Sequence, residues 1–434
     1  MSRNKDQQAK NISLINSFFL LTERFKTRTV DSAFSRFYTF FVRYGFDSQQ
    51  FTRTLFEFIR LVKKYDVTPT LPVTASVVKR HPSLFQKVQA MGVELAVHGY
   101  KHVDYTLLKS DIVRIHFKNA AKIFQQYNIN YFGYRFPYLR QSEEKIDLLE
   151  AAGFKWDSSK VISWDSLNPE IVGKKGWAAY QKILKTYQAA DAGKYATLPC
   201  IRKNIVEIPV SVPDDDILIE RLGLRDTKSI AKIWRRMLSS VHENGELLVL
   251  QVHPERFWWY KNALEKILRL SKSWGDVWIA PIGEIANWWM EREKFNFNIE
   301  RISNTRYKIT ANCTDRATVL QKDKIIKRRV WEIESPRKPV IGLSPATAAE
   351  VVNFLKTEGF VYQITSNPHE CNIFLGHKAN SDKGWKERIL KFIEKNKFPL
   401  IRFWRWPAGA KCSLAISGDI DYVDVWDYWE RFRE

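Results

Sequence analysis

The sequence has little cysteine, and the four cysteines form no Cys-x-x-Cys pair; they are Cys200, Cys313, Cys371 and Cys412. This spacing argues against a zinc ribbon or a disulfide framework and fits a reducing compartment. The sequence also has no apolar run approaching the ~20 residues that span a bilayer, and its first ten residues lead into no signal-peptide core. We therefore expect a cytoplasmic protein without a transmembrane helix.

Acidic residues are also scarce relative to basic ones, with 48 Asp+Glu against 69 Lys+Arg and a net charge of +21. Such a charge permits binding to nucleic acid, anionic lipid or an acidic glycan, and it identifies none of them. The basic residues are spread along the chain, which favours solvated faces over a specific nucleic-acid site. Peripheral membrane contact, with 38–42 as one candidate segment, stays an alternative, and the oligomeric state is not determined. The content of 45% hydrophobic and 27% charged residues excludes a mainly disordered chain.

From about residue 50 the sequence alternates between strand-like and helix-like segments. Strands separated by helices of this length predict a parallel sheet that forms a barrel or a doubly wound layer. The predicted strands are 67–73, 93–97, 129–134, 154–156, 206–210, 247–252 and 277–281. The predicted helices are 51–65, 82–91, 109–127, 143–152, 227–244 and 282–294.

The pattern changes near residue 295. Residues 295–322 alternate between polar and apolar, which predicts antiparallel strands. A strand–helix–strand unit follows at 339–365, then a strand at 373–375 and a helix at 385–394. We expect a smaller mixed α/β domain here.

Two histidines follow directly on the predicted strand 93–97, in the run His98-Gly99-Tyr100-Lys101-His102. Residues four apart on a helical turn share one face, so we expect both imidazoles to point the same way. Imidazole is a common zinc ligand, and two of them need a third ligand, usually a carboxylate. The pair alone is a weak signal, and its place at a strand's carboxyl end strengthens it.

Two further strands end in residues that could act on a substrate. Arg135-Phe136-Pro137-Tyr138 ends the strand after the histidine pair, where an arginine could hold a carboxylate and the Tyr138 amide could face an oxyanion. His253 ends the strand 247–252 and is a candidate acid or base. Taken singly, each could also be an ordinary turn or a core histidine.

Together these three sites resemble the motifs of the polysaccharide deacetylase family, carbohydrate esterase family 4, over about residues 50–290. The family's metal-binding histidines look like His98 and His102. Its Arg-x-Pro-Tyr motif looks like Arg135, Pro137 and Tyr138. Its Leu-x-Leu-x-His motif looks like Leu248, Leu250 and, with one residue more between, His253.

The family also has two aspartates at the end of its first strand, and none are found ahead of the helix 51–65, where Asp47 is better explained as a helix N-cap. A matching segment stands at the other end of the chain, where 412–417 leads into Gly418-Asp419-Ile420-Asp421. We infer a circular permutation, with 412–417 as the first barrel strand beside 67–73. The alternative is that 418–421 is a loop and 38–42 the first strand.

The predicted organisation is therefore an α/β fold with an incomplete barrel of about seven parallel strands and an added smaller domain. We expect an N-terminal extension at 1–35, the barrel at 36–294, the accessory mixed α/β domain at 295–400, and a C-terminal segment at 401–434 that returns to the barrel.

The resemblance implies a metal-dependent deacetylase that removes an N- or O-acetyl group from a glycan or glycan precursor, with a lipid-linked or anionic carrier as one option. It implies a divalent metal, zinc by default, held by Asp421, His98 and His102. It further implies Asp419 as general base, held by Arg135, His253 as general acid, and Pro137 and Tyr138 at the substrate. The division of roles between the two aspartates stays open. The rival is a catalytically inactive carbohydrate- or lipid-binding protein on the same scaffold.

Other candidates carry weaker expectations. Asp214-Asp215-Asp216 is interpreted as a solvated loop that could touch substrate, and Asp157-Ser158-Ser159 as a cap and turn. Trp164-Asp165 is the nearest match to the family's aspartate–tryptophan motif. Four tryptophans could stack on sugars, with packing as the default: Trp258, Trp259, Trp288 and Trp289.

Overall fold

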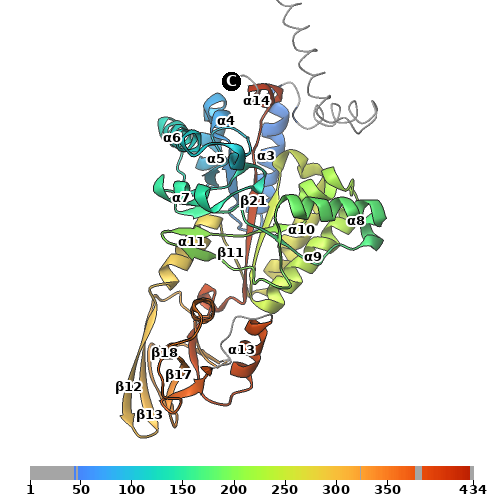
Figure 1. Ribbon diagram of the computed structural model, residues 1–434. Helices are drawn as coiled ribbons and strands as arrows, with labels where there is room; N and C mark the ends of the chain where they lie inside the picture. Colours follow the sequence, from blue (N-terminus) through green and yellow to red (C-terminus); the bar gives the residue numbers. More distant parts are fainter. Residues whose placement is uncertain (1–43, 45–46, 323, 377–383, 431–434) are drawn as a thin grey trace, which may run out of the picture.

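The computed structural model describes residues 44, 47–322, 324–376 and 384–430 (Figure 1). One large sheet has the strand order β6-β5-β9-β10-β21-β1-β2-β3-β4-β8-β7, with β11 paired to β21 outside this path. Apart from the antiparallel pair of β7 and β8, the neighbouring strands are parallel. The sheet is curled, with helices on its outside, and three smaller sheets follow. The predicted α/β class, an incomplete barrel plus a smaller mixed region, is confirmed.

The bounds of the barrel elements are as follows. The strands are β1 (Thr70–Val73), β2 (Glu94–Val97), β3 (Gly133–Tyr134), β4 (Trp156–Asp157), β5 (Val161–Ser163), β6 (Ala190–Asp191), β7 (Cys200–Arg202), β8 (Ile205–Glu207), β9 (Val210–Val212), β10 (Leu247–Val252), β11 (Val277–Ile279) and β21 (Cys412–Gly418). The helices are α3 (Ser48–Lys63), α4 (Ala75–Arg80), α5 (Pro82–Ala90), α6 (Ser110–Gln126), α7 (Glu143–Ala151), α8 (Pro169–Thr186), α9 (Thr227–Asn244), α10 (Phe257–Trp274), α11 (Ile282–Arg292) and α14 (Val425–Glu430).

Local sequence signals explain several of these bounds. Asp47 caps α3 by accepting from the Gln49 amide, as predicted, and Asp226 caps α9 in the same way. α9 ends at Gly245, whose φ of 66° is in the left-handed region that favours glycine.

The predicted strand 206–210 is wrong in one respect, because this stretch forms two strands, β8 and β9, at different places in the sheet. Pro209 lies between them. A proline has no backbone N–H to donate, so it interrupts a strand ladder.

The last strand of the chain lies in the middle of the sheet. β21 pairs in parallel with β10 over six residue pairs, from Leu247↔Ser413 to Val252↔Gly418, and with β1 at Thr70↔Ser417. The predicted placement of 412–417 beside β1 is therefore confirmed. The alternative first strand, 38–42, lies outside the described residues.

The two faces of the sheet bury different cores, because side chains alternate along a strand. Leu414 and Ile416 of β21 join the core between the sheet and its outer helices. Ala415 joins the inner core, which α11 fills with apolar side chains, including Trp288 and Trp289. Each strand therefore has one row of side chains that points into the barrel.

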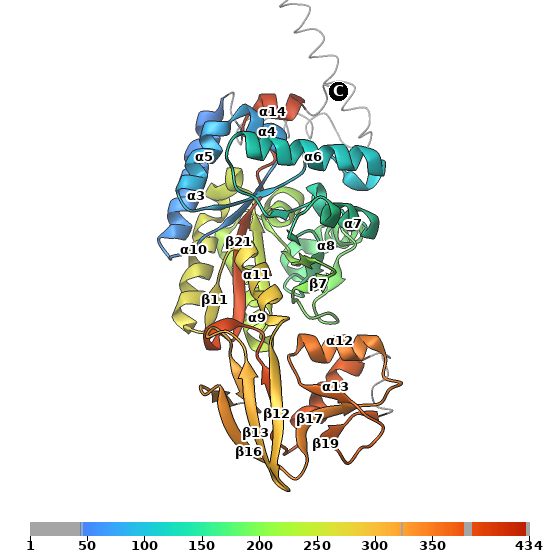
Figure 2. The ribbon, with the colours of Figure 1, turned by 90° about the vertical axis from the view of Figure 1, so that its left-hand side faces the viewer.

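The smaller region lies at the opposite end of β21 from α14 (Figure 1). It holds an antiparallel ribbon of β12 (Asn296–Ser303), β13 (Arg306–Asn312) and β16 (Val330–Glu334), and a second sheet of β14 (Val319–Gln321), β15 (Lys324–Ile326) and β20 (Ile401–Phe403). Its third sheet is parallel, with β17 (Lys338–Leu343) between β18 (Tyr362–Ile364) and β19 (Cys371–Phe374), beside α12 (Ala349–Thr357) and α13 (Trp385–Glu394) (Figure 2). Because β20 still pairs with β14, the chain returns to the barrel after Phe403, slightly beyond the predicted boundary at 401.

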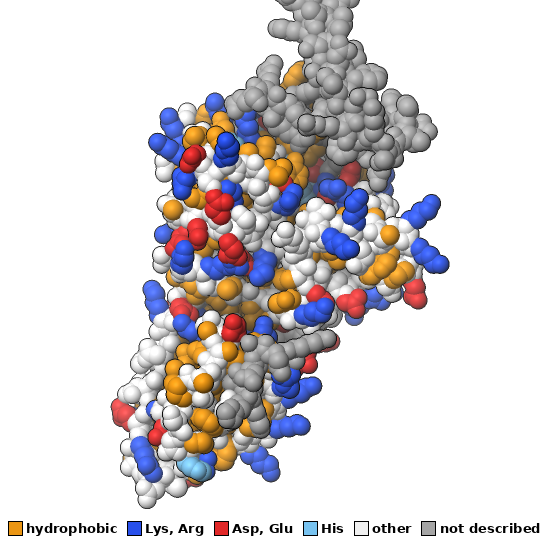
Figure 3. All heavy atoms as spheres, in the orientation of Figure 1, with side chains coloured by type: hydrophobic (Ala, Val, Ile, Leu, Met, Phe, Trp, Pro, Cys, Tyr) orange, Lys and Arg blue, Asp and Glu red, His pale blue; other side chains and the backbone are white. Residues whose placement is uncertain are grey.

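The surface shows no strong segregation of charge on the face seen in Figure 3. Lys and Arg side chains are spread over the barrel and the smaller region, with Asp and Glu between them. Within the part of the chain that the structure describes, no helix combines the length and the apolarity needed to cross a membrane.

Candidate active site

The inner-facing rows of four strands end in polar side chains at the carboxyl edge of the barrel. On β21 the inner row runs from Ala415 through Ser417 to Asp419, and Asp421 follows. By the same alternation β2 leads from Ala96 to His98, and β10 leads from Val249 to His253. At the end of β3, Arg135 is fully buried. Alternation and parallel pairing thus bring together residues from distant parts of the chain.

Two histidines and one aspartate form the centre of the site. The His98 Nε2 lies 3.3 Å from the Asp421 Oδ1, and the His102 Nε2 lies 3.4 Å from the Asp421 Oδ2. One possible ligand atom from each of the three residues lies within 4.8 Å of the others.

The predicted helical turn between the two histidines is wrong, because residues 98–102 form a loop. Gly99 has a φ of 83°, and a Cβ there would lie 2.9 Å from the Lys101 carbonyl oxygen. This glycine turn, rather than helical periodicity, brings the two rings to a centroid distance of 5.2 Å.

The hydrogen bonds of this cluster leave lone pairs facing one another. The His98 Nδ1 lies 2.9 Å from the Arg135 carbonyl oxygen, and since a carbonyl only accepts, this nitrogen carries the proton. A neutral His98 would therefore present the lone pair of its Nε2 to Asp421, whose buried Oδ1 has no hydrogen-bond partner among the described residues. Burial raises the pKa of Asp421, but the positive charge of His102, and then of His98, lowers it well below its usual range when the two rings are protonated, and a bound cation would take the place of that charge. A cation between these atoms resolves the conflict, so the donor set fits a divalent metal.

Asp419 is held beside this cluster by Arg135. The Arg135 Nη1 donates to the Asp419 Oδ1 and to the Ser417 hydroxyl, each at 2.6 Å. The other Asp419 oxygen, Oδ2, lies 3.9 Å from the His98 Nε2. Asp419 therefore has one oxygen fixed by an arginine and one directed towards the histidines.

The interpretation of Asp157-Ser158-Ser159 as only a cap and turn is wrong. The Arg135 Nε donates to the Ser158 carbonyl at 2.7 Å, and its Nη2 donates to the Ser158 hydroxyl at 2.8 Å. The Ser159 hydroxyl donates to Asp157 at 2.7 Å and accepts from the Phe136 amide at 2.8 Å. These residues fix the segment that carries Arg135.

His253 is paired with Asp215, which the sequence assigned to a solvated loop. That prediction is wrong, because Asp214 and Asp215 are buried and the Asp215 Oδ1 lies 2.8 Å from the His253 Nδ1. Burial lowers the pKa of His253, but the Asp215 carboxylate more than offsets this effect and raises the pKa to about 10. His253 is therefore protonated at neutral pH, with its Nε2 proton available. A carboxylate run directly after strand β9 and Pro213 was the signal that could have indicated this role.

Pro137 and Tyr138 lie at the rim of the cluster. Tyr138 has a φ of 59° and a ψ of 13°, which is left-handed backbone that a non-glycine residue rarely adopts. The Tyr138 ring meets the His102 ring edge-on at a centroid distance of 4.4 Å. Strained backbone of this kind often occurs at functional sites, and here it sets the direction of the Tyr138 amide.

The candidate tryptophans divide into two groups. Trp288 and Trp289 are buried in the inner core, and Trp164 is buried with its indole N–H donating to Ser211 at 3.1 Å. Trp258, in the first turn of α10 after His253, is 53% exposed. Of the five, only Trp258 and the half-buried Trp259 present a surface to a ligand.

Among the described residues, two other groups have the composition of metal ligands. In the first, His81, Asp424 and Asp427 are accompanied by Arg80, whose Nε lies 3.0 Å from Asp427, so a cation is already present. In the second, Asp215 and Asp214 lie with His253, whose Nδ1 is already hydrogen-bonded. The buried Asp427 Oδ1 also lacks a hydrogen-bond partner among the described residues, but it already faces the Arg80 charge, whereas Asp421 has only the two histidines beside it.

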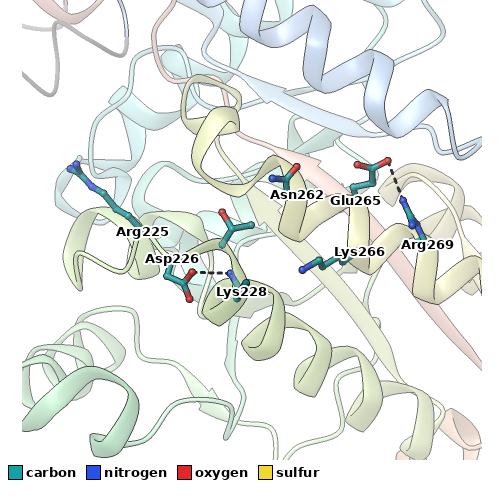
Figure 4. Close-up of a pocket in the computed structure, with 8 residues that line it drawn as sticks. Arg225, Asp226, Lys228, Asn262, Glu265, Lys266 and Arg269 are labelled. Carbon is teal, nitrogen blue, oxygen red and sulfur yellow. Dashed lines mark hydrogen bonds and ion pairs between the residues drawn. The ribbon is translucent and has the colours of Figure 1, made fainter.

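A groove of about 540 Å³ lies on the outer wall of the barrel (Figure 4). It runs between the start of α9, at Arg225–Lys228, and α10, at Asn262–Arg269. Glu265 forms an ion pair with Arg269 at 3.7 Å, and the Asp226 carboxylate accepts from the Lys228 backbone amide at 3.3 Å. The groove contains none of the residues of the cluster.

The fold and this edge define a class: a parallel-strand barrel protein with a two-histidine, one-carboxylate pocket flanked by an acid–base pair. Residues 41–156, about a quarter of the chain, match the family model for polysaccharide deacetylase. This agrees with the resemblance carried by the histidine pair and the Arg-x-Pro-Tyr motif.

Three solved structures have partial similarity to the chain. A protein assigned as a polysaccharide deacetylase from Mycobacterium smegmatis is 21% identical, with 56% of this chain and 77% of that chain covered and a TM-score of 0.42. PuuE allantoinase is 18% identical, with 54% of this chain and 72% of that chain covered and a TM-score of 0.44. The family 4 carbohydrate esterase from Streptomyces lividans, in complex with acetate, is 13% identical, with 44% of this chain and 82% of that chain covered and a TM-score of 0.26. These scores are low, and the similarities carry no argument about the reaction of this chain. No curated protein matches it.

Proposed function

We propose that the protein is a metal-dependent carbohydrate deacetylase. The observation that carries this proposal is the set of facing lone pairs at His98, His102 and Asp421, 3.3–3.4 Å apart, with Asp419 and His253 held beside them by separate ion pairs. The three ligands are those implied by the family resemblance, and the cation they suit is divalent, with zinc the default for this donor set.

A divalent metal bound there supplies Lewis acidity toward an acetyl carbonyl and an attacking water. Asp419 accepts the proton of that water at its Oδ2, while Arg135 holds the Oδ1 at 2.6 Å. The Tyr138 amide donates a hydrogen bond to the oxyanion as the tetrahedral carbon forms.

The bond from the acetyl carbon to the sugar nitrogen or oxygen then breaks. His253 donates its Nε2 proton to the leaving group, because its Nδ1 is occupied by Asp215. The products are acetic acid, which ionises to acetate by losing the second proton of the water, and the free amine or hydroxyl. Transfer of the proton held by Asp419 to the His253 Nε2 then returns both side chains to their starting states.

The substrate class is an acetylated glycan or glycan precursor. Exposed Trp258, five residues after His253 in the chain, supports this class, because a flat aromatic ring stacks on the apolar face of a sugar. The excess of basic side chains would suit an anionic or lipid-linked carrier.

We also infer that the barrel is circularly permuted relative to its family. The support is that the aspartates belong to β21, the last strand of the chain, while β21 occupies the slot between β10 and β1. In this arrangement the smaller region is inserted between the last and the first barrel strands.

The proposal is tested by paired substitutions at the two aspartates, with metal content and acetate release from acetylated chito-oligosaccharides as readouts. Asp419→Asn should lower kcat about 10²–10⁴-fold with metal retained, as expected for loss of a general base. Asp421→Asn and the double variant His98→Ala/His102→Ala should lose both metal and activity. Full metal content in the double variant would overturn the ligand assignment. An absence of stoichiometric metal in the wild-type protein would favour the inactive binding scaffold.

A further inference from the structure

The two ligand histidines are oriented by different partners. The Nδ1 of His98 is hydrogen-bonded to the backbone carbonyl of Arg135, and a side-chain substitution cannot remove this carbonyl. The His102 Nδ1 lies 3.3 Å from the hydroxyl oxygen of Tyr422, and both side chains are buried. A phenol can accept or donate a hydrogen bond, so it is compatible with either tautomer of the imidazole.

We propose that Tyr422 is a positioning residue that sets the metal affinity of the site by acting on His102. If His102 binds the metal through its Nε2, its Nδ1 carries the ring proton and donates a hydrogen bond to the Tyr422 hydroxyl oxygen. This inference rests on the proposed function. It goes beyond that function because it assigns to Tyr422 a role that neither the motifs nor the ligand set contains.

The packing around Tyr422 favours an orienting role for its hydroxyl. Tyr422 is only 7% exposed, and its ring contacts the rings of His102, Tyr44 and Tyr428 at centroid distances of 5.7, 6.1 and 5.3 Å. Tyr138 covers His102 by a separate edge-on contact. Since His102 is also only 7% exposed, water has little access to replace the hydroxyl if it is removed.

The position of Tyr422 in the chain links it to the ligand Asp421. The two adjacent residues lie at opposite nitrogens of the His102 ring, with the Asp421 Oδ2 3.4 Å from Nε2 and the Tyr422 hydroxyl 3.3 Å from Nδ1. A hydrogen bond to the second nitrogen of a ligating imidazole fixes its tautomer and ring orientation, and its loss typically costs about 10–100-fold in metal affinity.

The test compares Tyr422→Phe with Tyr44→Phe in the full chain. Tyr44 belongs to the same aromatic cluster, but its hydroxyl donates to Glu255 at 3.2 Å. Zinc dissociation constants are measured by competition with a chromophoric chelator, and the melting temperature of the metal-free protein reports on folding. Tyr422→Phe keeps the ring, so we expect a melting temperature close to that of the wild type and a zinc affinity about 10–100-fold weaker. Tyr44→Phe should bind zinc like the wild type.

Cobalt(II) provides a second measurement, because its visible absorption reports ligand geometry at saturating metal. The spectrum of Tyr422→Phe should differ from that of the wild type, and the spectrum of Tyr44→Phe should not. Equal zinc affinity and equal spectra in Tyr422→Phe and wild type would overturn the role of Tyr422 while leaving the metal site intact. Equal weakening in both variants would overturn it too, because the effect would then belong to the aromatic cluster. A wild-type protein that binds no zinc or cobalt would overturn the proposed function itself.

Discussion

The barrel and the smaller region both bury carboxylates, but they satisfy them differently. Glu358, where the smaller region meets the barrel, is 2% exposed, and its two oxygens face Arg405 and Arg402. At the carboxyl edge of the barrel, the buried Asp421 Oδ1 has no hydrogen-bond partner among the described residues and lies 3.3 Å from the His98 Nε2. A buried charge with complete partners holds two parts of a protein together, whereas one with incomplete partners is suited to bind a ligand. The comparison assigns the chemistry to the barrel and a structural role to the junction.

The largest expected effect comes from removing the last strand. β21 pairs with β1, β10 and β11, so a fragment ending at Lys294 would expose strand edges and uncover both cores of the sheet. We expect this fragment to be insoluble or molten and to bind no metal. Attaching residues 406–434 ahead of residue 36 through a short linker should restore folding and metal binding.

The matching deletion removes the smaller region instead. The rings of Phe295 and Phe403 lie 5.3 Å apart, so a few glycines can replace residues 296–402. This variant should melt at a lower temperature but still bind one metal. If the fragment 1–294 melts cooperatively at the temperature of the full chain, β21 is not required by the barrel and the permutation must be abandoned.

The second prediction concerns pH. Asp215 raises the pKa of His253 to about 10, and a general acid works only while protonated, so activity should fall as the pH rises through about 10. Asp215→Asn removes the main group that raises this pKa. The alkaline limb of kcat/KM should therefore move down by at least two pH units, towards or below the ordinary histidine value of about 6.5.

Glu358→Gln is the matched control for the pH profile, because it neutralises a buried carboxylate at the junction. It should lower the melting temperature and leave the alkaline limb unchanged. An alkaline limb that stays in place in Asp215→Asn would mean that another group is the acid.

The smallest expected effect is on stability at Asp214. Burial, with Asp215 and Asp216 nearby, raises the pKa of Asp214 to about 7, above the unfolded value of about 3.9. A raised folded pKa gives a contribution to stability that is present below the unfolded pKa and is lost as the pH rises through about 7. The Asp214 Oδ1 accepts a hydrogen bond from the Ile217 amide at 2.9 Å. Asp214→Asn keeps an oxygen that can accept this hydrogen bond and removes the negative charge. We expect a melting temperature about 2–5 °C above that of the wild type at pH 8.

The control for Asp214→Asn is the same comparison at low pH. At pH 5 the wild-type Asp214 is mostly protonated in the folded state, and only its ionisation in the unfolded chain favours unfolding, so the difference between the two melting temperatures should be clearly smaller than at pH 8. A constant difference at both pH values would show that the titration of Asp214 is not the cause.

The sequence predicts the long elements well because their signals are local. α9, β10 and α13 have the predicted bounds, and α9 carries a capping aspartate and a terminal glycine. α8 was not predicted; among its described side chains only Tyr180 is buried, and Gly173 interrupts it with a φ of 71°. A helix that buries so little has a weak periodic pattern.

The residues of the candidate site also divide into those with a local sequence signal and those without one. The ligands and Arg135 are recognisable because they follow strands in motifs of fixed spacing. Asp215 and Tyr422 are not, because a run of three aspartates has the composition of a solvated loop and a tyrosine near a strand end has no diagnostic spacing. Their roles depend on contacts with His253, 38 residues away, and with His102, 320 residues away.

The order of the strands also determines when the site can exist during synthesis. His98 and His102 leave the ribosome early, and more than 300 residues follow before Asp419 and Asp421 are translated. At roughly 5–20 residues per second this delay is on the order of half a minute. Until then the nascent barrel lacks its central strand and exposes the edges of β1 and β10, where another chain could pair. A growing chain of this protein therefore cannot assemble the proposed metal site before the smaller region has been made, and its need for chaperones should be greatest just before β21 emerges.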